Sequence, residues 1–132
     1  MNEETIKYWT DLSNYDLETA NAMLITKRFL YVGFMAHQTI EKILKAYFVK
    51  LRNEVPLYTH NLLLLAEETE LQNELSEKQL ELLEKLIPLN IEARYPKYKE
   101  ELLRSLTQEK CELILKETKE FQEWIIAKLQ KN

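Results

Sequence analysis

The sequence predicts an all-α protein, an up-and-down helical bundle of four to five helices. The first observation is a shortage of turn residues, because the 132 residues include only one glycine and three prolines. A β-sandwich or barrel would need a turn about every 8–12 residues. The second observation is that apolar residues recur at three- and four-residue steps over long stretches. No repeat or linker divides the chain, so residues 1–132 are expected to form a single domain.

The first two helices are predicted in the N-terminal half. Residues 4–27 carry one apolar stripe, and Lys27 with Arg28 places positive charge at the helix end, where it suits the helix dipole. The second helix is expected over about 31–51. Its apolar residues cover more than one stripe, so we expect it to lie at the centre of the bundle or at a subunit interface.

Two shorter helices are expected in the middle of the chain. After a loop marked by Pro56, Thr59 could cap a helix over about 61–71. Ser76 and Gln79 have the spacing of a capping box, which opens the fourth helix.

The end of the fourth helix and the start of the last are marked by prolines and a second cap. Pro88 is expected to kink the fourth helix, and Pro96 disfavours helical geometry at Tyr95, where the helix should stop. A second capping-box candidate begins at Ser105. The helix that follows it carries Cys111 on its apolar side, where a core role is expected.

Composition excludes several classes of function. The net charge of −4 argues against a protein that coats nucleic acid without sequence specificity. A single cysteine, Cys111, excludes a disulfide framework and a cysteine-rich zinc site. One glycine cannot form a glycine-rich phosphate-binding loop, and two histidines cannot form a multi-histidine metal site without other ligands. We therefore expect no metal and no cofactor. The acidic N-terminus lacks a secretory pattern, and the longest uncharged stretch is too short to cross a bilayer, so a cytoplasmic protein without a membrane anchor is expected.

A polar row interrupts the apolar second helix. His37, Glu41 and Lys45 fall on one face, because helical positions four residues apart lie above one another. In one interpretation this row is a notch for a ligand, in which His37 bonds Glu41 and Lys45 faces an anion. In the other, the row is an internal hydrogen-bonded network that fixes the helix register.

Further candidates lie near the third helix and after the fourth. His60 is expected either to interact with a helix cap or to contact a ligand. An arginine fork suits phosphate, and tyrosines offer stacking faces for a base. The alternative is an arginine paired with glutamate and tyrosines half-buried around a proline turn. Arg94 with Tyr95 and Tyr98 is the candidate of this kind. If Arg94, Lys97, Tyr98 and Lys45 line one groove, a phosphate-bearing ligand is expected to bind there.

Taken in order, three blocks of the sequence resemble the HEPN domain (higher eukaryotes and prokaryotes nucleotide-binding). They are His37-Gln38-x-x-Glu41-Lys42-x-x-Lys45-Ala46, then His60-x-Leu62 after the Pro56 loop, then Ala93-Arg94-Tyr95-Pro96. The resemblance implies an all-α bundle that is often a homodimer. It also implies a prokaryotic toxin–antitoxin context, in which the partner is a small nucleotidyltransferase.

Many HEPN proteins are metal-independent endoribonucleases that carry an arginine followed, after four to six residues, by a histidine. None of the four arginines here has a histidine at that spacing, and the nearest pair, Arg52 and His60, is separated by seven residues. The leading expectation is therefore a non-catalytic protein that binds a nucleotide, a nucleic-acid segment or a nucleotidyltransferase. One alternative is a divergent endoribonuclease that uses Arg94 with Tyr98 or His60, and another is a purely structural dimer or heteromer partner.

Overall fold

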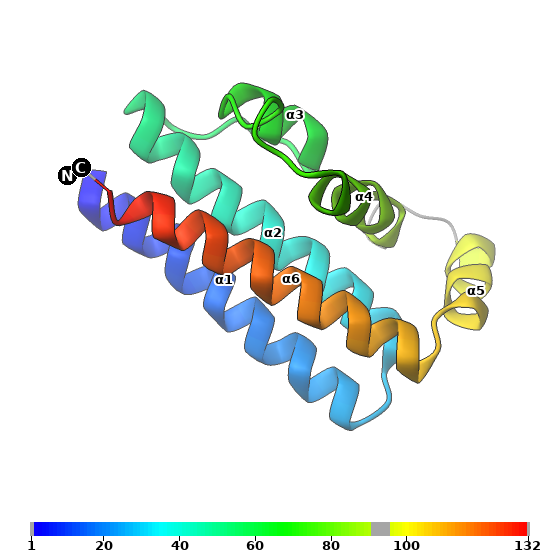
Figure 1. The fold of residues 1–132 in the computed structure, drawn as a ribbon. Helices are drawn as coiled ribbons and strands as arrows, with labels where there is room; N and C mark the ends of the chain where they lie inside the picture. Colours follow the sequence, from blue (N-terminus) through cyan, green and yellow to red (C-terminus); the bar gives the residue numbers. More distant parts are fainter. Residues whose placement is uncertain (1, 91–95, 132) are drawn as a thin grey trace.

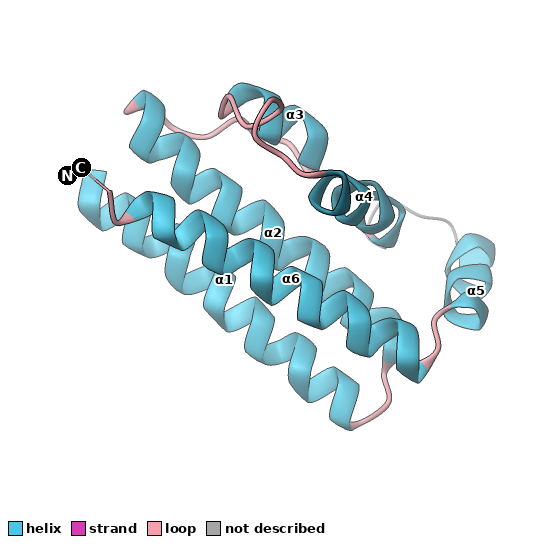
Figure 2. Cartoon of the chain, viewed as in Figure 1, coloured by secondary structure: helices cyan, strands magenta, loops and turns pink. Residues whose placement is uncertain are grey.

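The computed structural model describes residues 2–90 and 96–131, and all regular elements in these ranges are helices (Figure 2). They are α1 (Asn2–Ile25), α2 (Phe29–Arg52), α3 (Leu62–Glu68), α4 (Glu77–Leu86), the 3-10 turn η1 (Ile87–Leu89), α5 (Pro96–Ser105) and α6 (Gln108–Leu129). The predicted all-α helical bundle is confirmed. Within the described ranges, no helix has the length and apolar character needed to cross a membrane.

Three long helices make up the main layer of the bundle. Helix α1 runs antiparallel to α2 and α6, which lie alongside it (Figure 1). The shorter α3, α4 and η1 cover the other side of α2, and α5 lies at the end of the bundle where α2 and α6 begin (Figure 1). Helix α2 is therefore the central helix, which explains why more than one side of it is apolar. Its apolar sequence needs no subunit interface.

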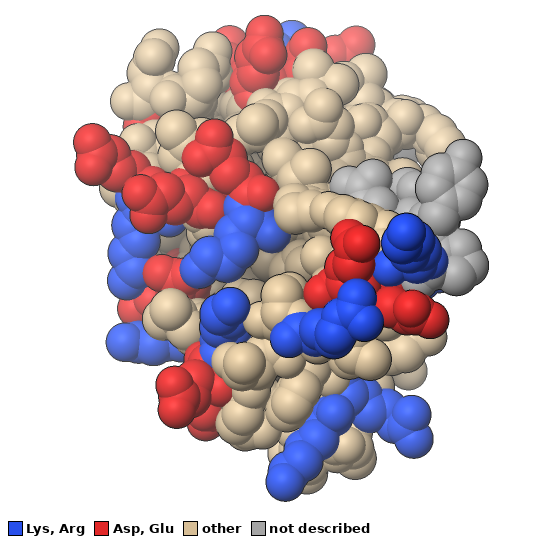
Figure 3. All heavy atoms as spheres, turned by 90° about the vertical axis from the view of Figure 1, so that its right-hand side faces the viewer, with Lys and Arg blue, Asp and Glu red and all other residues tan. Residues whose placement is uncertain are grey.

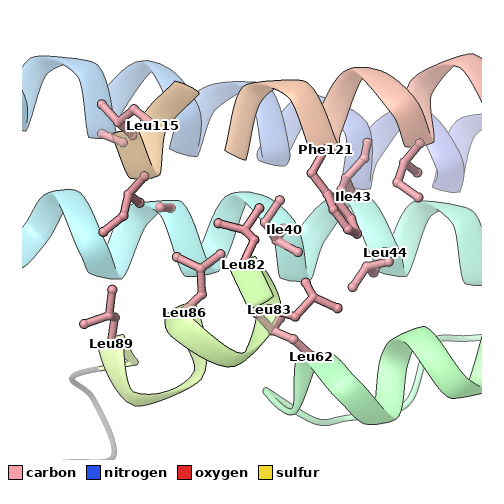
Figure 4. Close-up of a cluster of buried hydrophobic side chains, with 14 of the residues drawn as sticks. Ile40, Ile43, Leu44, Leu62, Leu82, Leu83, Leu86, Leu89, Leu115 and Phe121 are labelled. Atoms are coloured by element: carbon pink, nitrogen blue, oxygen red, sulfur yellow. The ribbon is translucent and has the colours of Figure 1, made fainter. Parts of the chain in front are cut away.

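The core is built around α2. Ile40, Ile43 and Leu44 of this helix are fully buried. Figure 4 shows them between Phe121 of α6 on one side and Leu62, Leu83 and Leu86 of the short helices on the other.

The only glycine in the chain, Gly33, lies in α2 against Leu89 of η1. A Cβ placed on Gly33 would lie 3.0 Å from Cδ1 of Leu89 and 3.4 Å from its Cβ. The missing side chain lets Leu89 pack directly against the helix backbone.

Helix starts follow the predicted caps in part. The capping box at Ser76 is confirmed: its hydroxyl accepts from the Gln79 N–H, and the Gln79 side chain accepts from the Ser76 N–H. The cap predicted at Thr59 is wrong. Asn61 is the N-cap of α3 and accepts from two backbone N–H groups, while the Thr59 hydroxyl accepts from the Asn61 N–H.

Residues 96–105 form a helix of their own, which was not predicted from the sequence. Pro96 is its first residue, a position at which proline is favourable because its missing N–H would be unpaired anyway. The last helix is capped by Thr107, not by Ser105, whose hydroxyl donates back to the Leu102 carbonyl. Helix α4 ends at Leu86, Pro88 lies in η1 and Asn90 is not helical, so the prediction that the fourth helix continues past Pro88 to about Tyr95 is wrong. Tyr95 itself falls outside the described residues.

Cys111 is fully buried in α6, as expected for a core residue. Burial raises the pKa of its thiol to about 11, so the reactive thiolate is disfavoured at neutral pH.

Candidate functional site

The candidate site is a polar cluster where α2 meets the loop of residues 53–61. Its centre is the Glu41 carboxylate, which is only 2% exposed. Oε1 of Glu41 accepts a hydrogen bond from Nδ1 of His60 at 2.8 Å, and Oε2 accepts from Nζ of Lys45 at 3.0 Å. A buried carboxylate is tolerated when its oxygens are paired in this way. Both oxygens of Glu41 are therefore used inside the protein.

Lys45 is held between α2 and α1. Its side chain is almost completely buried, and Nζ lies 5.3 Å from the ring centroid of Trp9 in α1, within the range of a cation–π contact. The anion that Lys45 meets in this structure is Glu41. The interpretation of the row as an internal network fits Lys45 better than the interpretation in which it faces a ligand.

His37 holds the backbone of the loop. Its Nε2–H donates to the His60 carbonyl at 3.1 Å. Burial lowers the pKa of His37 to about 4, against the opposing effects of the Glu41 charge, the Gln38 side chain and this carbonyl. The ring is therefore neutral at pH 7, and its second nitrogen, Nδ1, carries a lone pair.

That lone pair explains why the expected bond between His37 and Glu41 is not formed. Nδ1 of His37 lies 3.9 Å from Oε1 of Glu41, too far for a hydrogen bond, and both atoms are acceptors. His37 therefore acts on the loop through its other nitrogen.

His60 is the member of the cluster that reaches the surface. Its side chain is 44% exposed, its Nδ1 is held by Glu41, and its Nε2 has no hydrogen-bond partner among the described residues. Tyr58 lies beside it, 97% exposed, with the two ring centroids 6.1 Å apart. We call the exposed side chains of Tyr58 and His60 the His60 surface.

Tyr58 was not predicted as a site residue. The signal available in the sequence was its place in the loop, two residues before His60 and next to the apolar Val55 and Leu57. All three side chains are exposed, and grouped exposed apolar residues often mark an interaction site, whereas single ones are common.

Of the remaining candidates, the structure describes Lys97 and Tyr98, and it does not bring them together with this cluster. Lys97 and Tyr98 lie in α5, at the end of the bundle where α2 begins (Figure 1). Lys45 lies sixteen residues along α2 from Phe29, about 24 Å at 1.5 Å per residue. Arg94 and Tyr95 fall outside the described residues.

The face that carries α5 shows no uniform positive patch in its described part. Figure 3 shows Lys and Arg side chains interspersed with Asp and Glu across that face. Helix α5 itself contains Lys97, Lys99 and Arg104 together with Glu100 and Glu101. Among the residues that the structure describes, no group of three or more His, Cys, Asp or Glu side chains is arranged to hold a metal ion.

The chain was compared with protein-family models and with known proteins. The family model of the HEPN domain matches residues 6–129. Among solved structures, TT1696 from Thermus thermophilus is similar, with a TM-score of 0.75 and 19% identity over 97% of this chain and 99% of that chain. At that identity the likeness shows the fold alone. No curated protein matches.

Proposed function

Because the chain belongs to the HEPN domain family, we propose that it is a non-catalytic binding protein for a phosphate-bearing ligand, a nucleotide or a single-stranded RNA segment. The ligand is contacted at the His60 surface. The observation that carries this proposal is an exposed imidazole held by a buried carboxylate, with an exposed tyrosine ring beside it.

The free nitrogen of His60 suits this ligand class. When the ring is protonated, Nε2–H donates to a phosphate oxygen, and such charge-assisted bonds are among the stronger hydrogen bonds in proteins. When the ring is neutral, Nε2 accepts from a ribose hydroxyl. Both groups occur in a ribonucleotide.

Tyr58 supplies the second contact. Stacking of a base on an aromatic side chain contributes about 1–3 kcal/mol and tolerates any base, because every base has a π-face. The almost complete exposure of Tyr58 leaves its ring accessible to a base. The pair therefore fits a ligand with a base and a phosphate close together.

Endoribonuclease activity is the second candidate, and the Glu41–His60 pair is the observation that favours it. A carboxylate that orients a histidine is a common way to prepare a general base. Cleavage also needs a cation at the phosphate. Lys45 does not supply it, because its Nζ is paired with Glu41 and its side chain is buried.

Family membership extends the proposal to protein partners. On the family resemblance alone, the proposal also includes a homodimer, a partner nucleotidyltransferase and a toxin–antitoxin context. Because α2 is covered within one chain, its apolar sequence no longer supports the dimer.

Titration tests the binding proposal. Adenosine 5′-monophosphate, ATP and a labelled RNA of about ten nucleotides are titrated against wild type, His60→Gln and Tyr58→Ala. We expect each variant to lose about tenfold in affinity, and wild-type affinity to fall as salt rises. Leu113→Ala, at an exposed apolar position of α6, is the matched control and should bind like wild type.

The same titration separates the two proposed locations of the site. Arg94→Ala and Lys97→Ala test the groove expected from the sequence. Loss of affinity in these variants with normal binding by His60→Gln would move the site away from the His60 surface.

Incubation with single-stranded RNA in the presence of a chelator tests the enzyme candidate. We expect the RNA to remain intact over hours. Cleavage that persists with the chelator and disappears in His60→Ala would establish the endoribonuclease instead.

A further inference from the structure

We propose that Glu41 is a positioning residue for the His60 surface: it holds His60 in the one orientation and tautomer that present Nε2 to the ligand. The effect of Glu41 on ligand binding rests on the proposed function, whereas its effect on the His60 ring does not. Glu41 itself makes no contact with the ligand.

Two side chains of α2 hold His60 at two points. Nε2–H of His37 fixes the backbone carbonyl of His60, and Oε1 of Glu41 fixes its ring. The two α2 residues are one helical turn apart, so they act from a rigid element on a residue of the loop. The ring has no other hydrogen bond among the described residues, so removal of Glu41 leaves it free to rotate.

The hydrogen bond also selects the tautomer of His60. A carboxylate can only accept, so Nδ1 of His60 must carry the hydrogen and Nε2 is left for the ligand. An unrestrained imidazole exchanges the hydrogen between its two nitrogens. The contact with Glu41 therefore decides which atom faces outward.

Lys45 completes the arrangement by stabilising the Glu41 carboxylate. Its Nζ lies 3.0 Å from Oε2, and neutral His37 supplies no positive charge to the pair. With 2% exposure, Glu41 cannot reach a ligand. An effect of residue 41 on binding must therefore pass through its neighbours.

The variant for the test removes the acceptor without leaving a buried charge unpaired. Glu41→Leu combined with Lys45→Met replaces the ion pair by apolar side chains, an exchange that buried pairs often tolerate. The matched control removes a different ion pair, one that joins α1 to α2: Oδ2 of Asp16 lies 3.4 Å from Nζ of Lys42. The control variant combines Asp16→Asn with Lys42→Met.

The first readout is the ¹⁵N shifts of the His60 ring in ligand-free protein. Wild type and the control should show the hydrogen on Nδ1, and the Glu41→Leu/Lys45→Met variant should show a mixture of tautomers. A variant that keeps the hydrogen on Nδ1 would overturn the positioning role. This readout needs no ligand, so it decides the role even if the wild type binds none of the probes and the proposed function fails.

The second readout is affinity for adenosine 5′-monophosphate. We expect a loss of about tenfold or more in the Glu41→Leu/Lys45→Met variant and none in the control. Adding His60→Gln to the variant should cause little further loss, because Glu41 acts through His60. Equal affinity of variant and wild type, or full additivity with His60→Gln, would contradict the inference.

Discussion

Glu41 and His60 are nineteen residues apart in the chain, and their side chains meet at 2.8 Å. One lies in the interior of the central helix and the other at the surface of a loop. This contact joins the most buried charge of the candidate site to the half-exposed ring that carries the free Nε2. The chemistry that His60 can perform is therefore set by a residue that solvent does not reach.

The first prediction concerns stability against pH. Since burial lowers the pKa of His37 from 6.5 to about 4, the unfolded chain binds a proton in this interval and the folded chain does not. The folded state should therefore lose about 3 kcal/mol as pH falls from 6.5 to 4. Denaturant unfolding across this range measures the loss. His37→Gln should remove this part of the slope and His60→Gln should keep it, whereas equal slopes for His37→Gln and wild type would contradict the assignment.

The second prediction compares two serines that both have the sequence of a helix cap. Ser76→Ala should cost about 1 kcal/mol, because the Ser76 hydroxyl accepts from the Gln79 N–H at the start of α4. Ser105→Ala should change stability by less than about 0.5 kcal/mol, because the Ser105 hydroxyl caps no helix start. Thermal unfolding of both variants measures the difference, and equal losses would show that the cap assignment is wrong.

A third prediction addresses the polar network between the long helices. The buried Ser13 hydroxyl donates to the Thr39 carbonyl at 2.7 Å and accepts from Nε2 of Gln122 at 3.0 Å. Ser13→Ala should cost about 1–3 kcal/mol, because both partners are left in the interior. In a double-mutant cycle with Gln122→Leu, the combined loss should be smaller than the sum. Strict additivity would mean that the two side chains do not interact.

The fourth prediction concerns assembly. We expect a homodimer, so light scattering should give about twice the 15.9 kDa of the chain. Tyr8 and Tyr15 of α1 are exposed aromatic residues that a second copy could cover. Tyr15→Glu should then shift the mass towards the monomer, and Leu113→Glu on α6 is the control. A wild-type mass of one chain would remove the dimer from the proposal.

Local chemistry explains which parts of the fold the sequence could predict. Ser76 and Gln79 satisfy each other within one turn, so their pattern is visible without any tertiary contact. Pro96 was interpreted only as the end of the fourth helix, but α4 ends at Leu86 and Pro96 is the first residue of α5. Helix α5 was missed for that reason.

The candidate site was predictable only along a single helix. Periodicity placed His37, Glu41 and Lys45 on one face, but it could not show that Lys45 turns to Glu41. The meeting of His60 with Glu41 depends on the path of the loop, which no local pattern contains. Tyr58 lies in a loop without helical or strand periodicity, so its place beside His60 was the only signal in the sequence, and its exposure became visible only in the folded protein.

The close approach of Leu89 to Gly33 has a consequence for how this sequence can evolve. A methyl group at position 33 would meet Cδ1 of Leu89 at 3.0 Å, closer than ordinary contact. Alanine or serine at position 33 should therefore appear in relatives together with a smaller residue at position 89. The two positions are fifty-six residues apart in the chain, yet the size of one side chain limits the size of the other, so a graft of this central helix into a related protein should carry both.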